Sequence, residues 1–398
     1  MTDETNMMSM PTLCPSTLRP FTLRAVLTTA LTLAATILPA TNAGAQETLR
    51  RGSSNEQLID NQLREAVTRG HKWLADHQHK DGYWAELVGY KLNTDYRPLK
   101  DRPLPHVGVT SLALMSFLAG GHLPDRGKYG KELSRGLDFI LSASQDDGQL
   151  QLHGTRMYSH AFATLFLAEV YGMVERDDVK RVLQRSVDLI VDSQNSEGGW
   201  RYRPFARESD MSITVCQVLA LRSARNVGIH VPLTTIKNAQ NYVYRSAVRG
   251  NDRSYRFGGH GHYGDQGGSF RYQNRDHTRA TFPLTAAGVT TLYAAGEYNS
   301  PVIRNALDYL DRQVDGFSRD WYEHYFFYYG HYYAVQAYYI TGDPKWQLYF
   351  RKIKRMLLDR QQRDGRWRCT VGPGDAFGTA VSTLILQIPL QLLPIFQR

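Results

Sequence analysis

The sequence predicts an all-α protein, and within that class an α/α toroid of six helical hairpins, arranged as two concentric rings of six helices. Two observations lead to this fold. A motif of the form Gln-x-x-Asp/Glu-Gly-x-Trp recurs along the chain at intervals of about 50 or about 70 residues, as expected for a repeat protein. Between its copies, amphipathic segments alternate with apolar segments, and strand-like alternation is almost absent.

The recurring motif is complete in three places: Gln78–Trp84, Gln194–Trp200 and Gln361–Trp367. Weaker copies lie near three further positions: Gln145, Gly268 and Phe317. A structural element that each helical hairpin needs should recur once per hairpin, as this motif does. We therefore interpret the motif as structural rather than catalytic. Its glycine can take the left-handed backbone conformation that ends a helix. Its glutamine can bond backbone groups left open there, and its tryptophan can cover the helix that has ended.

The segment before each copy carries its apolar residues on one face, the pattern of an amphipathic helix. In one of these segments, for example, Leu133, Leu137 and Ile140 follow one another at helical spacing. Because one face is polar, we expect these helices to form the outer ring. The predicted outer helices are Asn61–His77, Lys131–Ser144, Val179–Ser193, Thr235–Ala247, Val302–Gln313 and Trp346–Arg360.

The segment after each copy is apolar, rich in small residues and without a polar stripe. Helices of this kind are buried on most sides, so we expect them to form the inner ring. The predicted inner helices are Val107–Ala119, Ser159–Val170, Ile213–Ala224, Ala280–Ala295, Tyr325–Ile340 and Ala376–Leu390.

The N-terminal segment has the features of a secretory signal. Arg19 and Arg24 precede the apolar run Ala25–Leu38, and the small residues Ala43–Ala45 then match a signal peptidase site before Gln46. An uncleaved anchor is the alternative, although the apolar run is short for a membrane span. We therefore expect an exported protein, periplasmic or secreted, with no transmembrane helix after signal cleavage.

The expected organisation is a signal peptide at 1–45, a linker at 46–56 and a single toroid domain at 57–398. The net charge of +9 favours anionic partners, but it is spread along the chain and no nucleic-acid motif accompanies it. Beyond the predicted signal only Cys216 and Cys369 remain. One disulfide between them is compatible with the sequence, which does not decide whether they pair.

The repeated motif resembles the QW motif of squalene and oxidosqualene cyclases, which protein prenyltransferase β subunits share in a looser form. Its six copies span nearly all of the predicted domain, so the resemblance is to the whole toroid. In that superfamily the motif ties successive outer helices together. The resemblance therefore implies no catalytic role for the glutamine, acidic or tryptophan residues of the motif.

The reaction centre of the cyclases is only partly matched. In that family an Asp-x-Asp-Asp-Thr segment begins an inner helix, and its central aspartate protonates an alkene. The similar segment here is Asp210–Thr214 (DMSIT), in which Ser212 stands at the position of the proton donor. Because a serine hydroxyl is too weak an acid for that step, we expect no cyclisation by alkene protonation.

The zinc site of the prenyltransferases is also incomplete. The resemblance implies an Asp-x-Cys pair on one inner helix and a histidine on a later one. Asp210 matches the aspartate, Ser212 replaces the cysteine, and His324 lies near the expected histidine. Without the thiolate we expect no cofactor, although zinc stays open. Asp210 and His324 remain the candidate acid–base residues.

Further candidates lie where the inner helices begin. Because the positive ends of the helix dipoles would converge at one mouth of the toroid, an anionic group would be favoured there. The candidate ligand-binding residues at these starts are His106, Tyr158, His160, Ser212, His277 and Asp375. The aromatic segment Trp321–Tyr339 adds Tyr325 and Tyr328. Helix capping and core packing are the alternative roles for these side chains.

A glycine-rich segment at 249–279 carries six arginines, which could neutralise a pyrophosphate or an acidic sugar. The alternative is a solvated loop. The arginines are Arg249, Arg253, Arg256, Arg271, Arg275 and Arg279.

Three functions are compatible with these features. The first is an exported toroid that binds an apolar or isoprenoid-like ligand, or a partner protein, without the chemistry of the resembled family. The second is an enzyme of that superfamily with altered chemistry. The third is a polysaccharide lyase or glycosidase acting on an anionic glycan: a lyase could use Tyr158 or His160 beside an arginine, and a glycosidase needs two carboxylates, such as Asp210 and Asp375.

Overall fold

The computed structural model describes residues 55–92, 95–249, 267–275, 278–316 and 326–396. The predicted signal peptide lies outside the described residues. In the described part, no helix combines the length and the apolar character that a membrane span needs.

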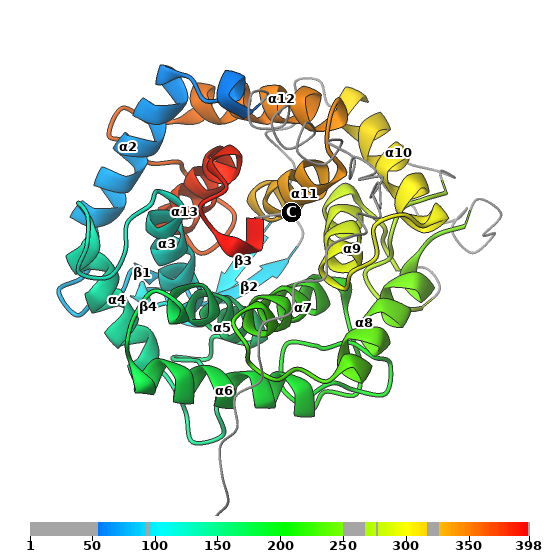
Figure 1. Cartoon of the computed structure of the whole chain (residues 1–398), viewed down its shortest axis with the longest axis horizontal. Coiled ribbons are helices and arrows are strands. Elements are labelled where there is room, and N and C mark those ends of the chain that lie inside the picture. The colour runs from blue at the N-terminus through cyan, green and yellow to red at the C-terminus, as the bar shows by residue number, and fades with distance from the viewer. Residues whose placement is uncertain (1–54, 93–94, 250–266, 276–277, 317–325, 397–398) are drawn as a thin grey trace, which may run out of the picture. The chain divides into compact units, whose positions relative to one another are not determined.

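The two predicted rings are confirmed, and the fold is an α/α toroid (Figure 1). The outer helices are α2 (Asn61–Asp76), α4 (Gly130–Ser142), α6 (Asp177–Asp192), α8 (Leu233–Ser246), α10 (Pro301–Gly316) and α12 (Lys345–Arg360). The inner helices are α3 (Val107–Ala119), α5 (Met157–Tyr171), α7 (Met211–Asn226), α9 (Phe282–Ala294), α11 (Phe327–Thr341) and α13 (Asp375–Gln387). Each inner helix contacts the next, and α13 contacts α3, so the inner ring is closed.

The inner helices are buried because they are apolar on all sides. Every residue of α3 is buried, and the hydroxyl of Ser111 donates to the carbonyl of Val107 one turn earlier at 2.8 Å, which satisfies it inside the core. Small residues allow neighbouring helices to approach closely. A Cβ atom at Gly108 would lie 2.8 Å from the Ser159 hydroxyl oxygen of α5.

The three complete Gln-to-Trp segments link neighbouring outer helices through their glutamines. Gln78, which follows α2, donates its side-chain amide to the carbonyl of Glu132 in α4 at 2.9 Å. Gln194, after α6, donates to Thr235 in α8 at 2.8 Å. Each glutamine also donates to the glycine carbonyl four residues later, so one side chain fixes a turn and a helix contact together.

The glycine and tryptophan of the segments also have fixed positions. Gly82 has a φ of +90°, and a Cβ there would lie 2.1 Å from the Arg135 carbonyl oxygen of α4. Both the backbone conformation and the close approach therefore require glycine. The Trp84 indole N–H donates to the Leu74 carbonyl at 2.9 Å and covers the end of α2, as predicted.

Two small antiparallel sheets between α2 and α3 were not predicted. They pair β1 (Ala85–Glu86) with β4 (Leu104–Pro105), and β2 (Gly89–Leu92) with β3 (Asp95–Pro98). Their strands are two to four residues long, too short to give a readable alternation. They matter because the β2–β3 hairpin contributes to the functional site.

The chain ends differently from the prediction. The predicted inner helix at Ala376–Leu390 ends at Gln387, and a 3₁₀ turn, η3 (Ile388–Leu390), follows. A second 3₁₀ turn, η4 (Pro394–Phe396), contacts α7. The buried Glu169 of α5 accepts a hydrogen bond from the Ile395 amide at 3.3 Å, which fixes this segment against the inner ring.

Candidate functional site

A cavity of about 820 Å³ lies at the end of the toroid where the inner helices begin. Aromatic side chains dominate its lining, and nine of them are tyrosines. The aromatic lining residues are Tyr90, Tyr96, Tyr158, Phe162, Tyr202, Tyr272, Phe326, Phe327, Tyr328, Tyr329, Tyr332, Tyr333 and Phe377. The cavity therefore offers many flat ring faces together with phenolic hydroxyls.

Four arginines line the same cavity: Arg156, Arg279, Arg360 and Arg368. Among the described lining residues there is no aspartate or glutamate. The guanidinium groups of Arg156, Arg279 and Arg360 lie against aromatic rings. That of Arg279, for example, is 5.0 Å from the ring centroid of Tyr272 and 5.2 Å from that of Phe326. The described part of the cavity wall is therefore cationic as well as aromatic.

Arg156 is the arginine best placed to hold an anion. It is the N-cap residue of α5, and its guanidinium lies 3.7 Å from the ring centroid of Tyr90 on β2 and 5.2 Å from that of Tyr202. No carboxylate of the described residues forms an ion pair with it. Burial lowers the pKa of Arg156 from its ordinary value, which reflects a cation partly withdrawn from water.

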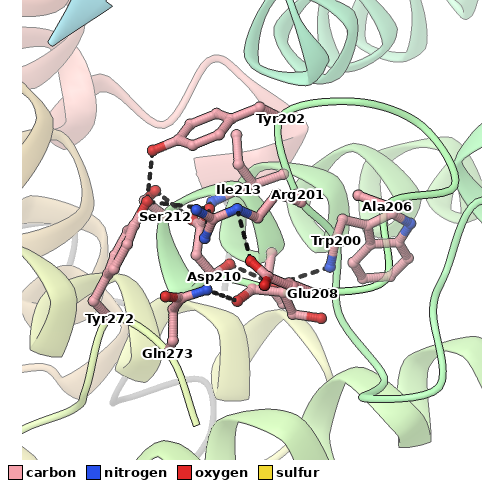
Figure 2. Close-up of polar contacts among 12 residues, drawn as sticks. Trp200, Arg201, Tyr202, Ala206, Glu208, Asp210, Ser212, Ile213, Tyr272 and Gln273 are labelled. Atoms are coloured by element: carbon pink, nitrogen blue, oxygen red, sulfur yellow. Dashed lines mark hydrogen bonds and ion pairs between the residues drawn. The ribbon is translucent and has the colours of Figure 1, made fainter. Parts of the chain in front are cut away.

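Asp210 lies behind the cavity wall. It is the N-cap residue of α7, fully buried, and its Oδ1 accepts from the Ile213 amide at 2.9 Å and the Ser212 hydroxyl at 2.5 Å (Figure 2). Its Oδ2 lies 3.4 Å from an Arg201 guanidinium nitrogen and accepts from the Tyr272 hydroxyl at 3.4 Å. Burial raises the pKa of Asp210, and these donors oppose that effect.

Two chains of hydroxyl groups connect this carboxylate with the cavity. The Tyr158 hydroxyl donates to Ser212 at 2.6 Å, and Ser212 in turn donates to Asp210. The hydroxyls of Tyr202 and Tyr272 lie 2.6 Å apart, and Tyr272 continues to Asp210 (Figure 2). Ser212 and all three tyrosines line the cavity, whereas Asp210 does not.

Several predicted site residues are found at the cavity. His106, Tyr158, Ser212 and Tyr328 line it. His106 also caps α3, since its Nδ1 accepts from the Val109 amide at 3.3 Å. Burial lowers the pKa of His106 to about 4, so its ring is neutral near pH 7.

Three predicted residues, His277, His324 and Tyr325, lie outside the described residues. The pairing of Asp210 with His324 is therefore untested. Within the part of the chain that the structure describes, no three histidine, cysteine, aspartate or glutamate side chains gather in the way a metal site requires.

His160 does not line the cavity, contrary to the prediction. Its Nδ1 accepts from the Leu150 amide at 3.0 Å, and its Nε2 donates to the Ser186 carbonyl of α6 at 3.1 Å. Burial lowers its pKa to about 4. Since residues two apart on a helix point to nearly opposite sides, Tyr158 faces the cavity while His160 packs against the outer ring.

Asp375 is also outside the cavity lining. Its Oδ1 accepts from the Cys369 amide at 2.9 Å, and its Oδ2 lies 3.4 Å from the Arg366 guanidinium. Neither Asp375 nor Asp210 faces the cavity, so this pair does not have the arrangement that a glycosidase needs.

The aromatic inner helix serves both roles weighed for it. Tyr328 and Tyr329 line the cavity from one face of α11. On another face, His331 bonds the Tyr349 hydroxyl at 2.7 Å, and Tyr338 donates to Asp311 of α10 at 2.8 Å. Part of the aromatic content is therefore lining, and part holds the two rings together.

The predicted arginine segment contributes one lining residue among those described, Arg279. Arg253 and Arg256 lie outside the described residues. Arg275 forms an ion pair with Glu208 at 2.9 Å on the surface.

Arg156 and the tyrosines of the hairpin were not among the predicted site residues. Arg156 immediately precedes an inner helix, so the rule that selected histidines and aspartates at helix starts would have found it, had arginine been included. The hairpin tyrosines Tyr90 and Tyr96 gave no signal, because their strands were not predicted.

Glu86 was also missed. Its Oε1 accepts from the Ala376 amide at 2.6 Å, which fixes the connection between α2 and α3 to the start of α13. Burial raises the pKa of Glu86 to about 7, and the charge of Asp375 acts in the same direction.

The described part of the chain contains two cysteines, Cys216 and Cys369. Cys369 lines the cavity and is partly exposed, whereas Cys216 is buried in α7, and burial raises its pKa to about 12. The disulfide that the sequence left open is absent between these two residues.

The fold and cavity define the chain as an α/α-toroid protein with an aromatic, arginine-rich cavity. No protein-family model matches the sequence, and no curated protein matches it. Solved structures do match the fold. A variant of the type II terpene cyclase MstE from Scytonema, in complex with geranylgeranyl dihydroxybenzoate, has a TM-score of 0.52 at 12% identity, covering 84% of this chain and 98% of that chain.

A variant of the α-1,6-mannanase GH76A from Salegentibacter, in complex with α-1,6-mannotriose, matches with a TM-score of 0.56 at 9% identity, covering 83% of this chain and 99% of that chain. A protein from Actinoplanes matches with a TM-score of 0.52 at 15% identity, covering 83% and 99%. At these identities the likeness shows the fold alone. The comparisons therefore support the toroid fold that the resemblance implies, and this fold is common to the terpene cyclase and the mannanase.

Proposed function

We propose that the toroid binds an acidic oligosaccharide whose sugars carry carboxylate groups. The observation that supports this most is the composition of the cavity wall, in which tyrosine rings and arginines occur together without a lining carboxylate among the described residues. Tyrosine rings stack on the apolar faces of sugars, and guanidinium groups bind carboxylates in a bidentate manner. The volume of about 820 Å³ lies within the range of pockets that hold small ligands.

A buried hydroxyl also favours a polar ligand. The Tyr329 hydroxyl is buried at the cavity wall and has no hydrogen-bond partner among the described residues. An unsatisfied buried polar group costs about 1–3 kcal/mol. A sugar hydroxyl that reached this group would satisfy it, whereas a hydrocarbon chain would not.

The structural neighbours are compatible with two ligand classes. The mannanase is in complex with a glycan, and the terpene cyclase is in complex with a geranylgeranyl compound. An isoprenoid-like ligand is therefore the main alternative, since aromatic walls also suit isoprenoid chains. The predicted export is compatible with a glycan ligand, which occurs outside the cytoplasm.

We do not propose hydrolysis or alkene protonation for this site. The carboxylates of Asp210 and Asp375, the pair considered for a glycosidase, do not line the cavity. Ser212, at the position of the cyclase proton donor, is a hydroxyl that itself donates to Asp210. Binding is therefore the core of the proposed function.

Calorimetric titration tests the proposal. We expect the purified protein to bind trigalacturonate or trimannuronate, and to bind neutral galactotriose at least about tenfold more weakly. Arg156→Gln should weaken acidic-sugar binding by about tenfold or more, because it removes the guanidinium between Tyr90 and Tyr202. Arg351→Gln removes the same charge from an exposed position on α12 and should leave the affinity unchanged.

Two results would contradict the proposal. The first is equal affinity for the acidic and the neutral trisaccharide, which would exclude carboxylate recognition. The second is binding of farnesyl monophosphate without binding of either acidic sugar, which would favour the isoprenoid alternative. Mass spectrometry of ligand that copurifies with the protein provides an independent check.

A further inference from the structure

We propose that Tyr158, Ser212 and Asp210 form a proton relay, through which Tyr158 removes the proton from the carbon next to the carboxylate of a bound sugar. This inference rests on the proposed function for its substrate class. It adds an activity, proton abstraction from a uronate, to a site otherwise assigned only to binding. That abstraction is the step shared by epimerisation and β-elimination of uronates.

The geometry of the relay is continuous from the cavity to the buried carboxylate. Tyr158 lies in the cavity wall and donates to the Ser212 hydroxyl at 2.6 Å. Ser212 donates to Asp210 Oδ1 at 2.5 Å. Both hydrogen bonds are short, and each hydroxyl can accept a proton on one side while it releases its own on the other.

Helix capping alone does not account for this arrangement. Capping of α7 needs only the bond from the Ile213 amide to Asp210. The N-cap residues of α5, α9, α11 and α13 make no side-chain capping bond at all. The carboxylate at the start of α7 instead continues, through Ser212 and Tyr158, to the surface of the cavity.

The direction of transfer follows from the surroundings of Asp210. Ser212, the Ile213 amide, Tyr272 and Arg201 all present hydrogen-bond donors or positive charge to its two oxygens. Such surroundings favour the ionised carboxylate as the resting form. Burial raises its pKa, so Asp210 takes up a proton more readily than an exposed aspartate. The relay therefore carries protons from the cavity inward.

Arg156 determines the class of substrate on which the relay can act, because its guanidinium binds a carboxylate. Its guanidinium lies 5.2 Å from the centroid of the Tyr202 ring, and the Tyr158 ring lies 6.1 Å from the same ring, centroid to centroid. Arg156 and Tyr158 therefore border the same tyrosine ring in the cavity wall. We infer that a carboxylate bound to Arg156 places its neighbouring carbon near Tyr158. The guanidinium also neutralises the charge that develops on the carboxylate when the proton leaves.

The step balances without any further reactant. The C–H bond of the sugar breaks, and its electron pair delocalises into the carboxylate held by Arg156. The proton forms a new O–H bond at Tyr158, whose own proton moves to Ser212, and the proton of Ser212 moves to Asp210. Reversal of the same three transfers returns a proton to the carbon, and this proton comes from solvent once the Tyr158 hydroxyl, which lies in the cavity wall, has exchanged with water. Neither a phenolate nor an alkoxide accumulates.

Deuterium exchange into trigalacturonate tests the relay. The protein is incubated with this probe in D₂O, and deuterium at the carbon next to the carboxylate is measured by mass spectrometry. We expect exchange with the native protein, and a loss of about 100-fold or more in Tyr158→Phe, Ser212→Ala and Asp210→Asn. Ser212→Thr keeps a hydroxyl at the same position and should restore exchange, which a purely structural role of Ser212 would not predict.

Controls separate the outcomes. Calorimetry on each variant shows whether the probe still binds, and circular dichroism shows whether the variant is folded. Tyr298→Phe, a change at an exposed tyrosine outside the cavity, should leave exchange unchanged. Binding without exchange in the native protein, or exchange that persists in Ser212→Ala, would overturn the relay while the proposed function stands. Absence of binding would overturn the proposed function itself.

Discussion

The side-chain amide of Gln361 donates to the carbonyl of Ala66 at 2.8 Å and joins residues 295 positions apart. Gln361 follows α12, the last outer helix, and Ala66 lies in α2, the first one of the ring. The same glutamine accepts a hydrogen bond from Arg69 of α2. One side chain therefore closes the outer ring, in the same way as Gln78 and Gln194 join its successive members.

We predict that Gln361→Ala lowers the free energy of unfolding by about 1–3 kcal/mol, since it removes the side-chain amide that donates to the carbonyls of Ala66 and Gly365. The matched control is Gln145→Ala. Gln145 belongs to the contracted segment, and its amide bonds only the nearby carbonyls of Ala143 and Gln151. Denaturant unfolding measures both variants. An equal or smaller loss in Gln361→Ala would contradict a role in closing the ring.

The glycine of the Gln194–Trp200 segment should tolerate no side chain. Gly198 has a φ of +86°, and a Cβ would lie 2.4 Å from the Asn238 carbonyl oxygen of α8. We expect Gly198→Ala to lower the free energy of unfolding by about 2 kcal/mol or more, from left-handed strain and the clash together. Gly172→Ala is the control, because nothing lies within 4 Å of its added Cβ and its φ is −75°. The midpoint temperature of thermal unfolding is measured for both variants. The control should have a midpoint close to that of the native protein.

Acid should destabilise the fold through His160. Burial lowers its pKa from 6.5 to about 4, so its contribution is fully present above pH 6.5 and is lost as the pH falls toward 4. The contribution amounts to roughly 3 kcal/mol. The free energy of unfolding, measured between pH 7 and pH 4, should therefore fall less steeply in His160→Gln than in the native protein. His230→Gln, at an exposed position, should leave the slope as it is.

Glu86 should have the opposite pH dependence. Its pKa is raised from 4.5 to about 7, so its contribution to stability is fully present below pH 4.5 and is lost as the pH rises through 7. Glu86→Gln keeps an acceptor for the Ala376 amide and removes the buried charge. We expect this variant to be more stable than the native protein at pH 8, by up to about 3 kcal/mol, and similar to it at pH 5. Equal differences at both pH values would contradict this.

Most of the helical architecture could be predicted from the sequence, because period and repeat act together. The inner helix at Val107–Ala119 was predicted with the bounds it has, and the others within a few residues. The β2–β3 hairpin could not be predicted, since its strands depend on pairing with each other and not on a local pattern. Its Tyr90 and Tyr96 were lost from the predicted site for that reason.

The site was predicted in part, because position along the chain and direction around the helix carry different information. The start of each inner helix was located well enough to select Tyr158, Ser212 and Asp210. The same rule also selected His160, which points to the outer ring because it lies two residues beyond Tyr158. The short link from Tyr158 through Ser212 to Asp210 joins two helices, so only the structure could reveal it.

The thiol of Cys369 lies in the wall of the aromatic cavity, so its reactivity reports directly on whether the acidic sugar binds there. The measurement is the rate of Cys369 alkylation by iodoacetamide, followed by mass spectrometry in a Cys14→Ser background, with the buried Cys216 as internal control. We predict that saturating trigalacturonate slows alkylation of Cys369 severalfold in the native protein, and that the same concentration gives much weaker protection in Arg156→Gln. An alkylation rate that trigalacturonate leaves unchanged, under conditions where calorimetry shows the sugar bound, would place the bound sugar outside the cavity.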